Sequence, residues 1–307
     1  MDSNGRGELG AIERLGRLLP AAPTGQTWIG DDAAVVAPPG GSLLLAADAV
    51  VAGVHADLSL VGLDDLGWKA IAVNVSDLAA MGGLPCHCLV TVCGPPDTDL
   101  ILLYRGIAEA AETYSCAVVG GDLSNAGVLV VSVAVTGTVE EGRAVLRSGA
   151  QPGDTVFVTG SLGWSALGLR LLQAGNGGEY PRAVMAHRRP RAEVQAGVAA
   201  RLGGATAMID VSDGLATDLT HVARASGVGI SLDTVPTAEG ATLEEALHGG
   251  EDYRLAFTAP APDLVEEAFT RQGVTVPIPI GQCTPHSGTL FLGGEPVPAL
   301  GWEHSWQ

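Results

Sequence analysis

Short apolar segments that end in an aspartate beside small residues recur along this chain, and they constrain its fold more than any other feature. The stretch "AMIDVSDGLATDL" (207–219) is an example, because an apolar run changes abruptly into Asp210, Asp213 and Asp218. An unpaired buried carboxylate is costly, so the fold must neutralise these charges. We expect Asp210 and Asp213 to bind a ligand, and Asp218 only to lie on the surface of the helix that follows.

The same pattern occurs in five separate segments. They are "WIGDDAAVV" with Asp31 and Asp32, "LLLAADAVV" with Asp48, "NVSDLAAMGG" with Asp77, "VVGGDLSNAG" with Asp122, and the stretch just described. For one such aspartate alone, capping of a helix N-terminus is the simpler interpretation. Five together favour a ligand site, because small neighbours let a ligand approach the backbone. Gathered carboxylates repel one another, and Mg²⁺, which bridges carboxylates to phosphates, would offset that repulsion.

Charge narrows the class of ligand. The formal net charge is −18, which argues against nucleic acid and anionic membranes as partners. Lys69 is the only lysine, so arginines, backbone N–H groups or metal ions must hold any phosphate. Walker, protein-kinase and dinucleotide-binding motifs are missing. These observations together indicate metal-assisted phosphoryl transfer at a nucleotide site of another kind.

Periodicity predicts a mixed α/β architecture in two domains, 1–148 and 149–307, joined near the turn-rich "SGAQPGD". The chain has 307 residues, 47% of them hydrophobic, and no apolar run long enough to span a membrane. No signal peptide is evident, and five cysteines without a CxxC pair fit reduced thiols, so we expect a cytoplasmic protein. The predicted helices cover 8–19, 63–83, 97–116, about 162–174, about 190–202 and a segment from Gly214; the predicted strands cover 42–53, about 86–93, 117–122, 128–139, 155–161, 207–212, 229–233, 252–258 and 288–294.

Several segments, in order and approximate spacing, resemble the thiamine-monophosphate kinase family. They are "IGDDAAV", "NVSDLAAMG", "GGD", "LRSGAQPGD", "IDVSDGLATDL" and "GGEDYRLAF". The resemblance runs from about residue 8 to the C-terminus and places the chain in the superfamily of aminoimidazole ribonucleotide synthetase and selenophosphate synthetase. It implies a two-domain fold, a homodimer whose N-terminal domains pair their sheets, and ATP-dependent phosphorylation of thiamine monophosphate without a covalent intermediate.

The resemblance also implies roles for particular residues. Magnesium ligands would be Asp32, Asp48, Asp77, Asp122, Asp210 and Asp213, with Asp77, Asp122 and Asp213 central to catalysis; Asp31 would only orient Asp32. Nucleotide contacts would be Gly121, Asp122, Arg147, Ser212 and Tyr104. The acceptor would meet His55, Glu251 and Trp302, and an aromatic face with a carboxylate suits its cationic thiazolium ring. As isolated residues, His55 could equally be an ordinary strand-end histidine, and Trp302 could simply pack the tail.

One departure from the family pattern stands at Ala46 and Ala47. The family carries hydroxyl side chains immediately before the aspartate that matches Asp48, and two alanines supply no side-chain oxygen. Backbone carbonyls or water could take their place at Mg²⁺. The segment between Asp233 and Gly249 is also short for the family. Two alternatives therefore stay open: a related phosphotransferase with another acceptor, and a nucleotide-binding homologue with impaired catalysis.

Overall fold

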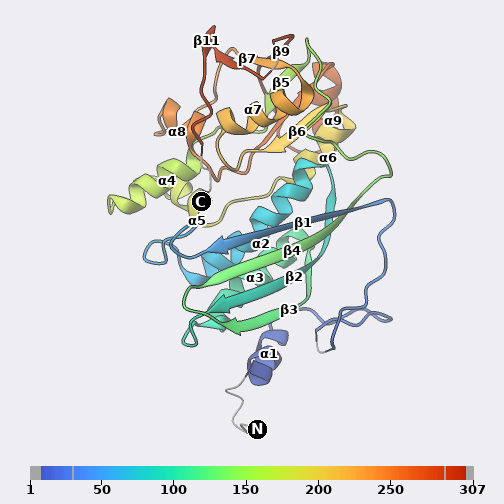
Figure 1. Ribbon diagram of the computed structural model, residues 1–307, viewed down its shortest axis with the longest axis vertical. Helices are drawn as coiled ribbons and strands as arrows, with labels where there is room; N and C mark the ends of the chain where they lie inside the picture. Colours follow the sequence, from blue (N-terminus) through green and yellow to red (C-terminus); the bar gives the residue numbers. More distant parts are fainter. Residues whose placement is uncertain (1–7, 30, 287, 302–307) are drawn as a thin grey trace. The chain divides into compact units, whose positions relative to one another are not determined.

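The structure is a computed structural model that describes residues 8–29, 31–286 and 288–301 (Figure 1). It divides into two compact units, each described here by itself. The first unit comprises Met1–Val75 and Pro85–Glu140, and the second comprises Ser76–Leu84 and Glu141–Gln307. A domain boundary at 148/149 stays a prediction.

The first unit is built on a mixed sheet with the strand order β1-β4-β2-β3. Strands β1 and β4 are antiparallel, and β2 and β3 are parallel, so the predicted mixture of connections is confirmed. Its elements are α1 (Glu8–Gly16), β1 (Ser42–Val51), α2 (Leu63–Ala80), β2 (Leu84–Gly94), α3 (Leu100–Tyr114), β3 (Ala117–Asn125) and β4 (Val130–Val139), although the last turn of α2 and the first residue of β2 are counted with the second unit.

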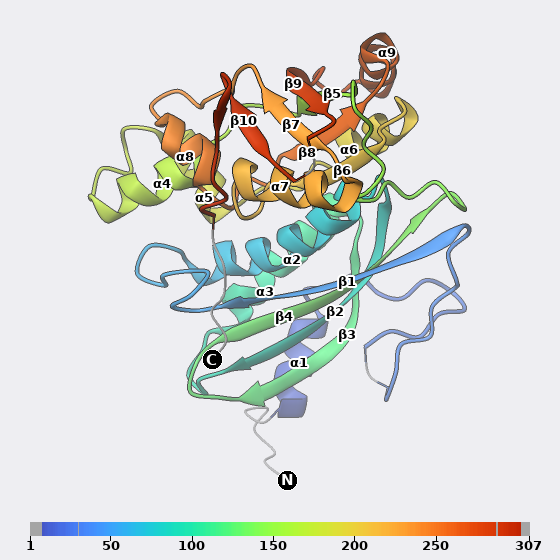
Figure 2. The same ribbon diagram turned by 45° about the horizontal axis from the view of Figure 1, so that its top comes forward.

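Helices α2 and α3 lie on the same side of this sheet (Figure 2). Their backbones touch, because a Cβ added to Gly67 would lie 2.1 Å from the Leu103 carbonyl oxygen. A Cβ added to Gly106 would lie 1.7 Å from the carbonyl oxygen of Asp64. The two glycines therefore permit a close helix crossing that no other residue type would allow at this spacing.

The second unit has a sheet with the order β11-β10-β7-β9-β5-β8-β6. Its elements are β5 (Thr155–Val158), α4 (Trp164–Gln173), α5 (Pro181–Arg188), α6 (Val194–Leu202), β6 (Ala207–Asp210), α7 (Leu215–Ser226), β7 (Gly229–Leu232), α8 (Leu243–His248), β8 (Leu255–Ala259), α9 (Pro262–Gln272), β9 (Ile278–Thr284), β10 (Leu290–Leu292) and β11 (Glu295–Pro296).

Alternation along β5 gives this sheet two apolar faces. Val156 and Val158 belong to the core cluster that includes α7, whereas Phe157 belongs to the cluster that includes α6 and α9. Phe157 stacks on Phe257 at 5.1 Å between ring centroids, and Phe257 stacks on Phe269 of α9 at 5.9 Å. Successive strand residues point to opposite faces, so a continuous apolar run here means helices on both sides.

The main predicted elements are confirmed, with differences at several ends. The helix expected from about 190 begins at Val194, and the strand expected from 252 begins at Leu255. Helix α4 begins at Trp164 because Gly163 before it has a left-handed φ of 89°. The prediction missed α5, α8, α9, β9 and β11; the first two are short, and α5 and α9 begin at prolines, which suit the first helical turn.

Candidate active site

In the first unit, Asp48 lies on β1 at the point where a side chain of helix α2 is hydrogen-bonded to the strand. The Asp48 backbone N–H donates to Oδ1 of Asn74 at 2.8 Å, and the Asn74 amide nitrogen donates to the Ala70 carbonyl at 2.8 Å. Asn74 is completely buried, so its side chain fixes the strand to the helix while the Asp48 residue stays exposed. Ala46 and Ala47 pair regularly with β4 just before it.

At two further acidic positions of the first unit, local hydrogen bonds involve the aspartates. The Asp32 N–H donates to Oδ1 of Asp31 at 2.8 Å, as expected if Asp31 orients its neighbour. Asp122 is exposed on β3, and its Oδ2 accepts the Ser124 hydroxyl at 2.8 Å. Beside it, Gly121 has a φ of 155°, and an added Cβ would lie 1.8 Å from the Val90 carbonyl oxygen, so this position requires glycine.

The acidic cluster of the second unit consists of Asp210, Asp213 and Asp218. Ser76, in the last turns of α2, donates its hydroxyl to Oδ2 of Asp210 at 2.6 Å, and both residues are buried. The Asp213 N–H donates to Oδ2 of Asp218 at 3.1 Å. Between them, Gly214 precedes α7 with a φ of 111°. The loop after β6 is therefore fixed at both ends by acidic side chains.

The expectation that Asp218 only decorates its helix is wrong. Asp218 is 2% exposed and accepts the hydrogen bond from the loop that precedes α7. Burial, and then the charges of Asp210 and Asp213, raise the pKa of its carboxyl well above the usual range. These three carboxyl groups thus interact electrostatically, and a neighbouring cation would reduce the repulsion between their negative charges.

No group of three or more His, Cys, Asp or Glu side chains within 8–29, 31–286 and 288–301 is arranged to hold a metal ion by itself. This arrangement is compatible with Mg²⁺, which commonly uses one or two carboxylates and takes its remaining ligands from water and substrate phosphates. The acidic cluster, with its mutual repulsion, therefore fits Mg²⁺ only as part of a site that phosphates complete.

The segment "GGEDY" lies against the same loop. Glu251 and Tyr253 donate their N–H groups to the carbonyls of Ser212 and Val211, at 2.7 and 2.9 Å. Both have left-handed backbones, with φ of 66° and 49°. A Cβ added to Gly250 would lie 2.5 Å from the Ser212 carbonyl oxygen, which explains the glycine. Predicted nucleotide and acceptor residues, Ser212 and Glu251, are thus backbone neighbours.

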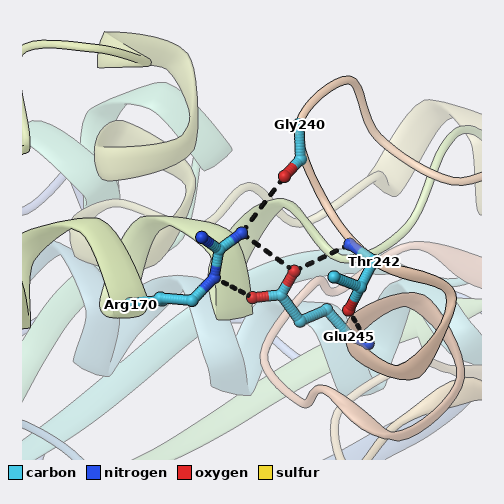
Figure 3. Close-up of polar contacts among 4 residues, drawn as sticks. All are labelled: Arg170, Gly240, Thr242 and Glu245. Atoms are coloured by element: carbon cyan, nitrogen blue, oxygen red, sulfur yellow. Dashed lines mark hydrogen bonds and ion pairs between the residues drawn. The ribbon is translucent and has the colours of Figure 1, made fainter.

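The chain before this segment is pinned to α4. Arg170 of α4 pairs with Glu245 of α8, with Nε to Oε1 at 2.7 Å, and also donates to the Gly240 carbonyl at 3.1 Å (Figure 3). Thr242 and Glu245 form a reciprocal capping box at the start of α8. Helix α8 ends at His248, with Gly249 as its C-cap, so these contacts fix the chain that leads into Glu251.

Two side-chain networks around Glu251 and Asp252 were not predicted from the sequence. His187 of α5 is buried, and its Nδ1 lies 3.5 Å from Oε2 of Glu251 and 3.2 Å from Oγ of Ser165. Asp252 accepts backbone N–H groups from Gly163 and Ser165 at the start of α4. Burial raises the pKa of the Asp252 carboxyl to about 6.

His55 of the first unit is held by its own neighbourhood. The Val51 N–H donates to Nδ1 of His55 at 3.0 Å, so a neutral His55 carries its proton on Nε2. The ammonium of Lys69 donates to the His55 carbonyl at 2.9 Å. Lys69 is 1% exposed, so the only lysine of the chain supports this turn from inside the unit.

The remaining predicted contacts have varied surroundings. Tyr104 is buried on α3, and burial, with Cys88 beside it, raises the pKa of its phenol to about 12. Arg147 is exposed, and its carbonyl accepts the Ser226 hydroxyl at 3.3 Å. Trp302 lies outside the described residues. Immediately before it, the Gly301 N–H donates to the Thr217 hydroxyl of α7 at 2.9 Å.

Comparison with known proteins assigns the class. Residues 30–139 match the AIR synthase related protein N-terminal domain, and residues 151–292 match the corresponding C-terminal domain. The two units thus belong to an AIR synthase related protein, as the predicted two-domain α/β architecture implied.

Curated relatives specify the family. The chain is 40% identical to thiamine-monophosphate kinase of Bacillus subtilis over 75% of this chain and 76% of the relative. It is 35% identical to the Aquifex aeolicus enzyme over 97% of this chain and 98% of the relative. The chain belongs to the thiamine-monophosphate kinase family, and it is a kinase and hence a transferase.

Solved structures agree with this family. A thiamine-monophosphate kinase from Stenotrophomonas maltophilia superposes with a TM-score of 0.82 at 32% identity, covering 93% of this chain and 96% of the other. A structure described as AaThiL complexed with AMPPCP and TMP gives 0.78 at 35% identity, covering 99% of both chains. Among the described helices, none is long and apolar enough to cross a membrane.

Proposed function

We propose that this chain transfers the γ-phosphoryl group of ATP to the phosphate of thiamine monophosphate, giving thiamine diphosphate and ADP. The bond between the γ-phosphorus and its bridging oxygen breaks, and an acceptor phosphate oxygen bonds to that phosphorus. Family membership supports the reaction, as does the complex of a relative with TMP and AMPPCP, an analogue of ATP.

The observation that carries the proposal lies in the second unit. The loop with Asp210, Ser212 and Asp213 is hydrogen-bonded along its backbone to the segment with Glu251. Oxygen ligands that suit a metal–phosphate complex and a carboxylate that suits a cationic acceptor are thereby adjacent on two segments that backbone hydrogen bonds join. That adjacency is what in-line transfer between two bound substrates needs.

We further propose Mg²⁺ as the metal. When bound, it would neutralise negative charge on the phosphates. The residues that would hold it are Asp32, Asp48, Asp77, Asp122, Asp210 and Asp213. The neutral hydroxyl of Ser76 orients Asp210 without cancelling its charge. The acceptor phosphate is already an oxyanion, so positioning and charge neutralisation matter more than a general base.

The ligand contacts form the next part of the proposal. Gly121, Asp122, Arg147 and Ser212 would contact the nucleotide, and Arg147 is exposed as that role requires. His55, Glu251 and Trp302 would contact the acceptor. Tyr104 remains a predicted nucleotide contact, although its burial on α3 favours a packing role in this structure.

A homodimer and a cytoplasmic location complete the proposal. The dimer is supported by Leu43 and Leu45, alternate residues of β1 that are 52% and 71% exposed. Adjacent exposed leucines on a sheet are typical of an interface.

The test is direct detection of thiamine diphosphate from thiamine monophosphate, ATP and MgCl₂, with a reaction lacking magnesium as the control. Magnesium-dependent product is expected. Absence of product in a folded protein that binds ATP would contradict the proposal.

Ala46 and Ala47 favour a second candidate, a homologue that binds nucleotide with impaired transfer or uses another phosphate acceptor. The same assay separates these, because ATP binding without product supports impairment, and ADP release with a different phosphorylated acceptor supports the related kinase.

A further inference from the structure

His187 and Glu251 form a buried contact that belongs to none of the roles assigned so far. His187 is 4% exposed near the end of α5, and its Nδ1 lies 3.5 Å from Oε2 of Glu251. The same nitrogen lies 3.2 Å from the hydroxyl of Ser165, which is 1% exposed on α4. All three residues belong to the second unit.

The backbone position of Glu251 is well defined. The left-handed φ of 66° and the bond from its N–H to the Ser212 carbonyl define where its Cα lies. The side chain still has three rotatable bonds, and ordering such a chain is costly in entropy. A ligand that requires one orientation of the Glu251 carboxylate therefore binds more tightly when another side chain already holds the carboxylate in that orientation.

The platform that carries His187 is rigid. A Cβ added to Gly168 of α4 would lie 2.1 Å from the Ala183 carbonyl oxygen of α5, so the two helix backbones are in direct contact. Asp252, next to Glu251, is tied to the N-terminus of α4 through the N–H of Ser165 at 3.0 Å. Two consecutive residues, Glu251 and Asp252, are thus held by two helices that cannot shift independently.

We propose that His187 is a positioning residue that orients the Glu251 carboxylate toward the thiamine acceptor. In this arrangement a proton on Nδ1 is directed at Oε2, and the carboxylate so oriented would meet the acceptor's cationic heterocycle or its amino group. At 3.5 Å the contact is long, and hydrogen bonds that serve a bound substrate often tighten only in the complex. This inference rests on the proposed function, because it concerns the acceptor of that reaction.

The test compares His187→Asn with His187→Leu. The two new side chains have nearly the same size, but only asparagine places an N–H donor where Nδ1 lies. We expect His187→Leu to raise the KM for thiamine monophosphate roughly tenfold, which corresponds to about 1.4 kcal/mol. Its kcat at saturating acceptor and its KM for ATP should stay within about twofold, because the nucleotide side is untouched. His187→Asn should recover most of the acceptor affinity.

A second comparison uses the Glu251→Gln background. If His187 acts through the carboxylate, adding His187→Leu to Glu251→Gln should raise the acceptor KM by much less than it does alone. Should His187→Leu fail to fold, Ser165→Ala removes the oxygen that competes with Oε2 for the Nδ1 proton and should lower the acceptor KM about threefold with kcat unchanged.

The outcomes distinguish the inference from the function beneath it. Equal acceptor KM values for the leucine and asparagine variants, additive effects with Glu251→Gln, or an unchanged acceptor KM in Ser165→Ala would overturn the role of His187 while leaving the reaction in place. A wild-type protein that makes no thiamine diphosphate would overturn the proposed function and this inference with it.

Discussion

Replacement of Asp252 by asparagine should flatten the pH dependence of stability. The Asp252 carboxyl accepts N–H groups at the start of α4, and burial raises its pKa to about 6, against an ordinary value of 3.8 in the unfolded chain. The folded state therefore holds this proton at pH values where the unfolded state has released it. As a result, stability falls as the pH rises from about 4 to about 6.

The size of the effect follows from the two pKa values. A difference of about two pKa units corresponds to about 3 kcal/mol over the whole window. By the linkage relation, about 1.4 kcal/mol of this change in unfolding free energy falls between pH 5.0 and 7.5. The Asp252→Asn variant lacks the titrating group and should not show this part of the change.

Urea denaturation of the wild type and Asp252→Asn at pH 5.0 and 7.5 measures the difference. The wild type should lose about 1.4 kcal/mol more unfolding free energy than the variant over this interval, because all other groups titrate alike in both. Asp263→Asn, which removes an exposed carboxylate at the start of α9, controls for the loss of one negative charge. Parallel pH profiles for the wild type and Asp252→Asn would refute the reasoning.

Three further predictions concern the remaining parts of the site. Asp77→Asn and Asp122→Asn should each lower turnover by roughly 100-fold without changing the circular dichroism spectrum, since they remove charge that stabilises transfer; near-normal turnover would remove them from the metal set. Ala47→Thr should lower the Mg²⁺ concentration for half-maximal activity if the missing hydroxyl is costly, and an unchanged titration would mean that carbonyls and water suffice. Lys69→Met leaves the partly buried carbonyl of His55 without its ammonium donor and should cost about 1–3 kcal/mol in urea denaturation; unchanged stability would show that the contact is dispensable.

Local patterns were sufficient to predict most of the fold. The run that contains Val156, Phe157 and Val158 is apolar on both faces, and the structure packs helices against both. Gly214, where the prediction began a helix, is the residue before α7. These features depend on neighbours in the sequence, and neighbouring residues are what periodicity and turn chemistry describe.

Local sequence patterns could not predict the contacts that orient the side chains of the site. Ser76 and Asp210 are separated by 134 positions, and His187 and Glu251 belong to different elements, one of them an unpredicted short helix. Asp218 follows a helix start, where an acidic residue usually faces water, and only the tertiary packing shows that it faces the loop instead. A buried polar residue in an apolar run, such as Ser76 in "NVSD", was the one available signal.

The donors around the acidic residues explain how an acidic chain can orient carboxylates without cancelling their charge. Asp210 accepts the neutral hydroxyl of Ser76, and Asp218 accepts a neutral backbone N–H. An arginine in either place would fix the carboxylate equally well but would neutralise it. Burial, and then the charges of Asp210 and Asp213, raise the pKa of the Asp218 carboxyl well above its usual range. Lys69, which could have neutralised an acidic loop, instead donates to a carbonyl inside the first unit. Neither of the two donors to Asp210 and Asp218 carries a charge, which suits the proposed binding of cations that arrive with the phosphates.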